Sequence, residues 1–348
     1  MKRQHSRFFT IITSMMVFLM LGFSVSSFSQ ADTQTRSSKK STSISTSTPV
    51  KRYGQLAVKG RFLIDQHGTP IALHGQAFGW STWWPQYWNS NVVSWLASDW
   101  KVDVVRASMG IDTHPGYLND STTQVNLLRT IVDAAIKDGI YVIIDWHCEA
   151  FHQAEAVAFF KKMAQMYGKY PNIIYEIINE PNNTQTWPEV KAYANAVIPA
   201  IRQYDTKNII VVGSPFWDQK IREVADSPLT GYSNIMYSVH FYAATHGQWL
   251  RDDCQYALNK GIPIFITECN GSEATGSGHI DYKQWDAWWK FCDDNRISWI
   301  NWSVSAKPGE LCSILKPGAS AKGHWTASQL TESGIYVRNK LRNYHNEK

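Results

Sequence analysis

The sequence predicts an α/β protein, a (β/α)8 TIM barrel with a short N-terminal β-hairpin. From residue 70 onward, eight short apolar runs alternate with longer segments of helical pattern. This alternation is typical of parallel strands joined by crossover helices, and eight such units can close into a barrel. Six of the apolar runs end in ionisable, amide or aromatic residues, where barrel strands present functional side chains. A chain of 348 residues with 44% hydrophobic content can bury a core of that size.

Residues 1–30 are predicted to be a signal peptide. They have a basic start with Lys2, Arg3 and Arg7, then an apolar run over 8–23, and small residues near the expected cleavage site around Ser29. The apolar run contains polar residues and is shorter than the roughly 20 residues that a spanning helix needs. We therefore expect a secreted protein, extracellular or periplasmic, with no membrane anchor.

Residues 31–52 are rich in Ser, Thr and Lys, lack apolar periodicity, and are predicted to be a disordered linker. Residues 1–52 carry 8 of the 34 Lys and Arg but 1 of the 29 Asp and Glu, which leaves 26 basic against 28 acidic residues in 53–348. The folded part is therefore not basic. Nucleic-acid binding, which depends on neutralising phosphates, has little support.

Residues 53–348 are predicted to form the barrel, which would be the catalytic domain. A hairpin over 56–58 and 61–64, turning at Lys59-Gly60, is expected to plug its bottom. The eight predicted strands are 71–78, 102–108, 140–147, 173–180, 208–215, 235–242, 263–269 and 297–304. The predicted helices are 91–100, 122–139, 151–169, 187–204, 217–226, 248–260, 282–295 and 326–343. Gly139 and Gly261 follow two of these helices, as C-capping glycines do.

The five cysteines, in a chain expected to be exported, permit up to two disulfides. Their connectivity cannot be deduced from spacing. Cys254 and Cys292 are one candidate pair, because their helices are expected to be neighbours. The alternative is that all five are small buried residues.

The residues that end the strand runs are expected to meet at one face, because the C-terminal strand ends of a TIM barrel form its active-site face. A single polar residue there is more often the start of a loop. Six segments with the same feature favour a functional site. The residues are Arg106, His147, Asn179 with Glu180, His240 with Tyr242, Glu268 and Trp302.

Glu180 and Glu268 end the fourth and seventh strands and are the expected catalytic pair. Glycosidic hydrolysis needs one carboxyl group to protonate the leaving oxygen and another to stabilise or attack the anomeric carbon. Arg106 near Glu268 would keep that carboxylate ionised, with a hydrogen bond from Tyr242, while desolvation would keep Glu180 protonated. Asn179 is placed to contact the sugar 2-hydroxyl.

Two further carboxylates, Glu176 and Asp145, are interpreted as buried supports beneath the site. A metal centre is the rival interpretation of the His and carboxylate residues. The chain has no HExxH motif and no close pair of His residues, and an Arg in the bowl opposes a divalent cation. No metal and no cofactor are expected. Trp302 is expected to lie under the sugar that is cleaved, whereas loop packing is an equal alternative for Trp83, Trp84 and Trp88.

At these residues the sequence resembles glycoside hydrolase family 5, particularly its secreted endoglucanases. The matching stretches are YGQLAVKG (53–60), VDVVRASMG (102–110), YVIIDWH (141–147), YEIINEP (175–181), SVHFYAATH (238–246), PIFITE (263–268) and NWSVSAKPGE (301–310). The resemblance covers residues 53 to about 343.

The resemblance implies Glu180 as general acid/base and Glu268 as nucleophile. It implies direct contacts around them from Arg106, His147, Asn179, His240 and Tyr242, with Trp302 as the sugar-stacking residue. Lys307 and Glu310 match polar contacts at distal glycone subsites, despite a one-residue insertion at 308–309, and Trp217 resembles an aglycone-side stacking residue. Many relatives carry a His where this chain has Ala77-Phe78-Gly79-Trp80, and a disulfide of some relatives that involves the counterpart of Cys312 is in doubt here.

The expected function is therefore a retaining endo-β-1,4-glucanase that hydrolyses internal bonds of cellulose-type glucans by double displacement. The alternatives are a β-mannanase, licheninase or xyloglucanase on the same scaffold, or a non-catalytic glycan-binding protein. The carboxylate pair argues against the last of these, because a binding protein has no use for it. No carbohydrate-binding module is apparent before Lys348, so a soluble or amorphous β-1,4-glucan is the expected partner, and a monomer is expected.

Overall fold

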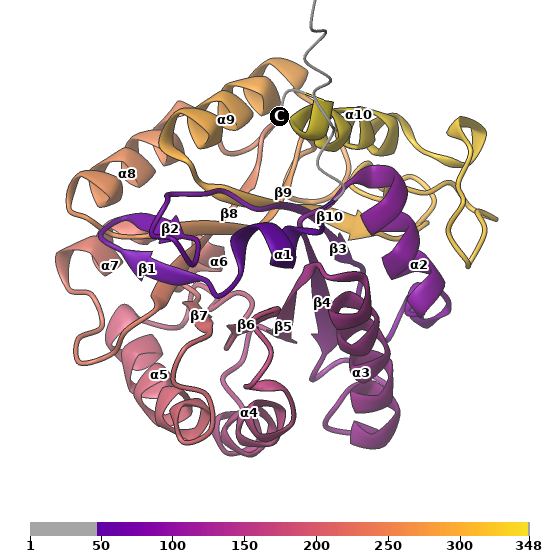
Figure 1. Ribbon diagram of the computed structural model, residues 1–348. Helices are drawn as coiled ribbons and strands as arrows, with labels where there is room; N and C mark the ends of the chain where they lie inside the picture. The colour runs from indigo at the N-terminus through magenta and orange to yellow at the C-terminus, as the bar shows by residue number, and fades with distance from the viewer. Residues whose placement is uncertain (1–46, 347–348) are drawn as a thin grey trace, which may run out of the picture. The chain divides into compact units, whose positions relative to one another are not determined.

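The computed structural model describes residues 47–346 and contains the predicted (β/α)8 barrel (Figure 1). Eight parallel strands close in the order β10-β3-β4-β5-β6-β7-β8-β9. Each of these strands pairs with the next along the chain, and β10 also pairs with β3 to close the barrel. The strands are β3 (His74–Phe78), β4 (Val104–Gly110), β5 (Tyr141–His147), β6 (Ile173–Glu176), β7 (Ile209–Val212), β8 (Ile235–Tyr242), β9 (Ile264–Asn270) and β10 (Ser298–Val304). All eight predicted strands are present.

Helices surround the barrel in Figure 1, and local signals in the sequence fix where several of them begin and end. Asn89 and Asp120 accept backbone N–H bonds at two N-termini, Thr186 and Glu189 form a capping box at a third, and Gly139 ends a helix in the left-handed conformation. The helices are α2 (Ser90–Trp95), α3 (Ser121–Asp138), α4 (Gln153–Tyr167), α5 (Trp187–Arg202), α6 (Pro215–Asp218), α7 (Ile221–Asp226), α8 (Gln248–Asn259), α9 (Tyr282–Asn295) and α10 (Glu332–Asn346). Shorter segments are a π-helical turn η2 (Leu96–Trp100) and the 3-10 turns η1 (Pro85–Tyr87) and η3 (Ala327–Gln329).

The predicted hairpin is confirmed as β1 (Ala57–Lys59) and β2 (Phe62–Ile64), which pair antiparallel. Figure 1 views the barrel from the end that this hairpin covers. Leu56 and Leu63 are buried in one cluster with barrel residues such as Ile143 and Ile209. A second, larger cluster fills the space between the strands and the helices. The hairpin therefore closes the bottom of the barrel and leaves the C-terminal strand ends as the open face.

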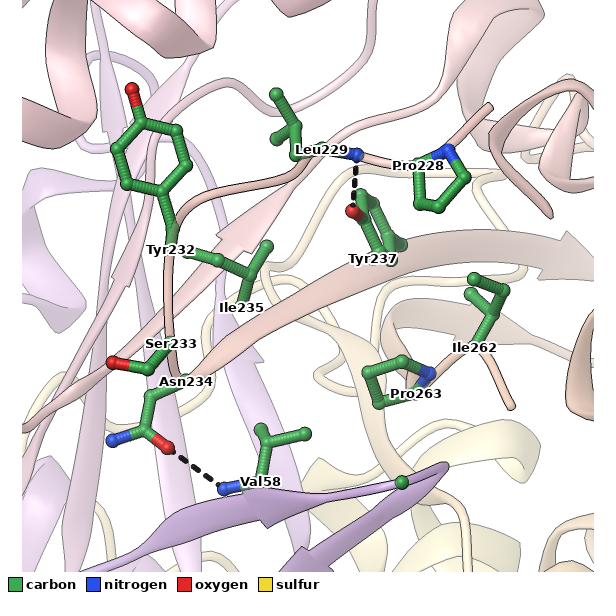
Figure 2. Close-up of a pocket in the computed structure, with 11 residues that line it drawn as sticks. Val58, Pro228, Leu229, Tyr232, Ser233, Asn234, Ile235, Tyr237, Ile262 and Pro263 are labelled. Carbon is green, nitrogen blue, oxygen red and sulfur yellow. Dashed lines mark hydrogen bonds between the residues drawn. The ribbon is translucent and has the colours of Figure 1, made fainter. Parts of the chain in front are cut away.

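A pocket of about 280 Å³ lies beside the hairpin, at the same end of the barrel (Figure 2). In this pocket the Asn234 side chain accepts a hydrogen bond from the backbone N–H of Val58 at 2.9 Å, and Tyr237 accepts one from Leu229 at 2.9 Å. Its lining contains no carboxylate, imidazole or ammonium group. The pocket therefore does not contain the site predicted from the strand ends.

Five of the predicted boundaries need correction. The linker was predicted to extend to residue 52, but α1 (Pro49–Tyr53) is ordered, because Pro49 and Tyr53 are buried and Val50 donates a backbone hydrogen bond to Gly139. The fourth and fifth strands end at Glu176 and Val212, before residues that turn into loops. The predicted helix over 217–226 is broken between α6 and α7, and the last helix begins at Glu332 rather than 326.

The predicted signal peptide and most of the predicted linker, residues 1–46, lie outside the described residues. In the part of the chain that is described, none of the helices combines the length and apolar character needed to cross a bilayer. All five cysteines are free and buried, so the candidate pair Cys254–Cys292 is not bonded.

Candidate active site

Arg106 is the centre of a buried polar cluster inside the open end of the barrel. It lies on β4 and is fully buried. Its Nε donates to Glu176 at 2.7 Å, one terminal nitrogen donates to Glu268 at 2.8 Å, and the other donates to Asn179 at 2.6 Å. That last nitrogen is also 3.1 Å from Asp145. One guanidinium thus fixes four side chains from β5, β6, the loop after β6 and β9. These polar partners explain how a buried arginine is tolerated.

Glu268 receives a donor on each carboxyl oxygen. Arg106 donates to Oε2, and the Tyr242 hydroxyl donates to Oε1 at 2.6 Å. Tyr242 and Glu268 come from neighbouring strands, β8 and β9, whose register pairs Tyr242 with Asn270. Two donors stabilise the ionised form of a carboxyl group and restrict its rotation.

Glu180 has different surroundings. It lies just after β6, where its backbone N–H donates to Cys148 at 3.3 Å, and its side chain is 18% exposed. Among the described residues its carboxyl group has one hydrogen-bond partner, Nδ1 of His240, at 2.7 Å. Burial raises the pKa of Glu180 to about 8, although Arg106 acts in the opposite direction. Glu180 is therefore protonated at neutral pH.

His147 and Trp302 form one wall of the site. Nδ1 of His147 is 2.7 Å from Asp145, and burial lowers the pKa of this imidazole, so His147 is neutral. The rings of His147 and Trp302 are stacked with centroids 5.1 Å apart, and Trp80 meets His147 edge-on at 4.2 Å. Asp145 and Glu176 are fully buried beneath this wall, consistent with the supporting role expected for them.

Three predicted residues lie outside the Arg106 cluster. Lys307 and Glu310 follow β10 and pair with each other at 3.1 Å, and Glu310 also accepts a hydrogen bond from Ser313 at 2.8 Å. Trp217 lies in α6, after β7, in ring contact with Phe216. Within residues 47–346 none of the three has a hydrogen bond or ion pair with the cluster.

Of the other aromatic residues, Trp83 is 56% exposed, whereas Trp88 is buried and donates a hydrogen bond from its indole to Gly79.

Asp218, the last residue of α6, was not among the predicted site residues. It is fully buried, and its Oδ2 lies 3.2 Å from Nε2 of His240, on the side of the imidazole opposite Glu180. Thr267 also contacts Nε2, at 2.9 Å. The segment was predicted to be helical, and an aspartate in a first helical turn gives no signal of a buried contact.

Glu180, His240 and Glu268 each offer one ligand-type atom, and these atoms lie within 4.8 Å of one another. A cation bound to all three would compete with Arg106 and Tyr242 for the oxygens of Glu268. The arrangement therefore fits a protonated carboxyl facing an ionised one better than it fits a metal centre.

A closed (β/α)8 barrel with two facing glutamates at its C-terminal end, one held by two donors and one with a raised pKa, is the arrangement of the glycoside hydrolase class. Within that class, the chain belongs to the cellulase family, glycosyl hydrolase family 5, which matches residues 64–308.

The chain is similar to several named endoglucanases and solved structures. It is 43% identical to an endoglucanase of Clostridium saccharobutylicum over 294 residues, which are 83% of this chain and 65% of that protein. A solved structure from Cytophaga hutchinsonii is 45% identical, with a TM-score of 0.85, and the match covers 86% of this chain and 98% of that one. The catalytic domain of a Thermobifida fusca endoglucanase, solved with cellotetraose, is 34% identical with a TM-score of 0.81, covering 85% and 100%. The chain spans 57% to 65% of the length of three curated endoglucanases that it matches.

Proposed function

We propose that this protein is a retaining endo-β-1,4-glucanase that hydrolyses internal bonds of cellulose-type glucans by double displacement. The observation that carries the proposal is the spacing of the two glutamates, whose carboxyl oxygens approach within 4.8 Å. Retaining glycosidases hold their two carboxyl groups about 5 to 5.5 Å apart, whereas inverting enzymes leave room for a water at about 6.5 to 9.5 Å.

Glu268 is the proposed nucleophile. Its contacts with Arg106 and Tyr242, one on each carboxyl oxygen, favour the ionised form and fix the orientation of the carboxyl group. The same contacts must weaken as the carboxylate loses its charge on attacking the anomeric carbon. Tyr242 and Arg106 therefore also stabilise Glu268 as a leaving group in the second step.

Glu180 is the proposed acid/base. Its raised pKa keeps a proton available for the leaving oxygen at neutral pH, and the ionised form left behind then removes a proton from the attacking water. Its partly exposed side chain, in contrast to the fully buried Glu176, is accessible to a substrate.

The remaining predicted residues have proposed roles in substrate binding. Trp302 is proposed to stack on the sugar next to the cleaved bond, and His147 and Asn179 to contact its hydroxyls. Lys307 and Glu310 are proposed glycone contacts, and Trp217 an aglycone contact. The names of the relatives and the cellotetraose bound to the Thermobifida fusca enzyme support a β-1,4-glucan as the substrate.

We also propose that the protein is secreted and acts as a monomer. The basic and apolar pattern of residues 1–30 supports export, and a polymeric substrate outside the cell requires it.

The test is hydrolysis of a panel of polymers with the product anomer followed by proton NMR. Carboxymethylcellulose and barley glucan should be cleaved with a rapid loss of viscosity, and the new reducing ends should appear first as the β-anomer. A preference for mannan, lichenan or xyloglucan would show that the proposed substrate is wrong, but it would not contradict the proposed mechanism. An initial burst of α-anomer would contradict the role of Glu268.

A further inference from the structure

Asp218 lies on the far side of the imidazole that contacts Glu180. His240 is between two carboxyl groups: Nδ1 is 2.7 Å from Oε1 of Glu180, and Nε2 is 3.2 Å from Oδ2 of Asp218 and 2.9 Å from the Thr267 hydroxyl. A hydroxyl can donate or accept, so Thr267 is compatible with either state of Nε2 and does not decide between them. Burial lowers the pKa of His240 to about 4, so the imidazole is neutral at neutral pH and has one N–H. Which nitrogen carries that proton decides whether His240 donates to Glu180 or accepts from it.

Two arrangements contain the same number of protons. In the first, Asp218 is ionised, the His240 proton is on Nε2, and the Glu180 carboxylic acid donates to Nδ1. In the second, Asp218 is protonated and donates to Nε2, the imidazole proton is on Nδ1, and Glu180 is ionised. Both arrangements have the same net charge, so local donors decide between them.

The local donors favour an ionised Asp218. The backbone N–H of Ser214 donates to its Oδ1 at 2.5 Å, and the Ser238 hydroxyl donates to its Oδ2 at 2.5 Å. Burial raises the pKa of Asp218 well above its ordinary value, although these two donors act in the opposite direction. Burial raises the pKa of Glu180 as well, so the one negative charge that the two groups share goes to the carboxyl group with more donors. Glu180, in contrast, has only the imidazole as a partner among the described residues. A negative charge is therefore better compensated on Asp218 than on Glu180.

The backbone keeps Asp218 in place. Phe216, Trp217 and Asp218 have left-handed φ values of 59°, 52° and 61°. The turn is attached to the chain just after Glu180, because Trp217 donates a backbone hydrogen bond to Pro181 at 2.8 Å. Three consecutive non-glycine residues in this conformation cost free energy, and a buried carboxylate anchor offsets that cost.

We propose that Asp218 is a positioning residue that holds the imidazole proton of His240 on Nε2 and so keeps Glu180 protonated for its acid step. This inference rests on the proposed acid/base role of Glu180. Asp218 acts through His240 and does not touch the substrate.

Several other charged or titratable groups face this trio from the strands and loops around it. These groups are present in both the wild type and a variant at position 218. Their effect on the pKa of Glu180 is therefore the same in both proteins and cannot account for a difference between them. They are Arg106, Asp145, His147, Glu149, Glu176, Tyr242, His246 and Glu268.

The test is Asp218→Asn, with Asp226→Asn as a matched control at an exposed site. Asparagine accepts from Ser214 as aspartate does and tolerates the left-handed φ, but its amide donates to Nε2. The imidazole proton then moves to Nδ1, and this N–H donates a hydrogen bond to the Glu180 carboxylate. The alkaline limb of the kcat/KM profile should move down by about one to two pH units, the size expected for one added hydrogen bond to a carboxylate. The acidic limb should stay in place.

Nitrogen-15 NMR of histidine-labelled protein gives a readout that does not depend on activity, with the His240 signals assigned by their loss in His240→Gln. The wild type should have its proton on Nε2 and Asp218→Asn should have it on Nδ1. An unmoved alkaline limb, or a wild-type proton on Nδ1, would overturn the inference. If Asp218→Asn does not fold, Ser238→Ala serves instead, since it removes a donor from Asp218 and should move the limb in the same direction by a smaller amount. If the wild type is inactive on every β-glucan, the proposed function is wrong. The NMR experiment would still show which nitrogen of His240 carries the proton and so test the role of Asp218.

Discussion

The two glutamates of the site differ mainly in the number of donors directed at each carboxyl group. Glu268 accepts from Arg106 and Tyr242, whereas Glu180 contacts one neutral imidazole. In a site with little water, two donors lower the free energy of a carboxylate and their absence favours the acid. Identical side chains therefore have different surroundings, and only those of Glu180 favour the acid form.

Replacing either glutamate by glutamine should remove most turnover on polymer. We expect Glu180→Gln to lose roughly 10² to 10⁴ in kcat and Glu268→Gln to lose more, because the covalent step needs a nucleophile. The affinity for cello-oligosaccharides should change little, since the amide has nearly the same shape. Glu273→Gln, at a partly exposed residue after β9, is the control. Either active-site variant with wild-type kcat would refute the assignment of that residue.

The raised pKa of Glu180 also predicts a cost in stability. A carboxyl group that titrates near 8 when folded and near 4.5 when unfolded binds more protons in the native state between those values. It therefore costs nothing below about pH 4.5, and its cost grows as the pH rises towards 8. Glu180→Gln should match the wild type at pH 4 and be more stable by a few kcal/mol at pH 8.5. Urea unfolding at both pH values measures this, and a difference that does not vary with pH would contradict it.

At the residue level, the sequence predicted the neighbours of the glutamates better than their detailed contacts. Tyr242 as a donor to Glu268 follows from strand order, because β8 and β9 are adjacent. Arg106 beside Glu268 follows from the closed barrel, in which side chains from the non-adjacent strands β4 and β9 meet in the interior. Asp218 could not be found this way. Its position depends on a left-handed turn after β7, which no pattern of apolar residues specifies.

Among the secondary-structure elements, the strands were predicted better than the loops at their C-terminal ends. Buried strands have nearly continuous apolar runs, so the runs predicted their existence and starts within a few residues. The loops at the C-terminal end are different, since their conformation is set by contacts with other segments. Pro181 and Asn182, for example, accept backbone hydrogen bonds from Trp217 and Phe216 and so break the predicted helix.

The hairpin β1–β2 should contribute to stability without contributing to chemistry. Leu63 is 1% exposed and packs at the barrel end opposite the glutamates. Leu63→Ala should lower the free energy of unfolding by roughly 2 to 5 kcal/mol, with kcat/KM unchanged at temperatures where the protein stays folded. Ile335→Ala, on the surface of α10 with 38% exposure, should cost much less. Equal and small losses in both variants would show that the hairpin is not part of the core.

Within the described residues, the apolar cluster beneath the hairpin and the candidate active site lie at opposite ends of one barrel. Apolar side chains fill the interior at the hairpin end, and a network of ionisable groups fills it at the other end. Folding must bury one arginine with several carboxyl groups, and the apolar core and helix packing have to offset that cost. A barrel of this size buries enough apolar surface to need no cross-links.

The cysteines provide a test of that last point. All five are buried and unpaired, and burial raises the pKa of each thiol, so the native protein should not react with a thiol reagent. After unfolding in guanidinium without a reductant, iodoacetamide should alkylate all five, as counted by mass spectrometry. Prior treatment with a reductant should change neither that count nor the midpoint of thermal unfolding, because no bond is present to reduce. Three or fewer alkylated thiols in the untreated sample would mean that a disulfide forms, and Cys254 with Cys292 would be the first pair to examine by peptide mapping.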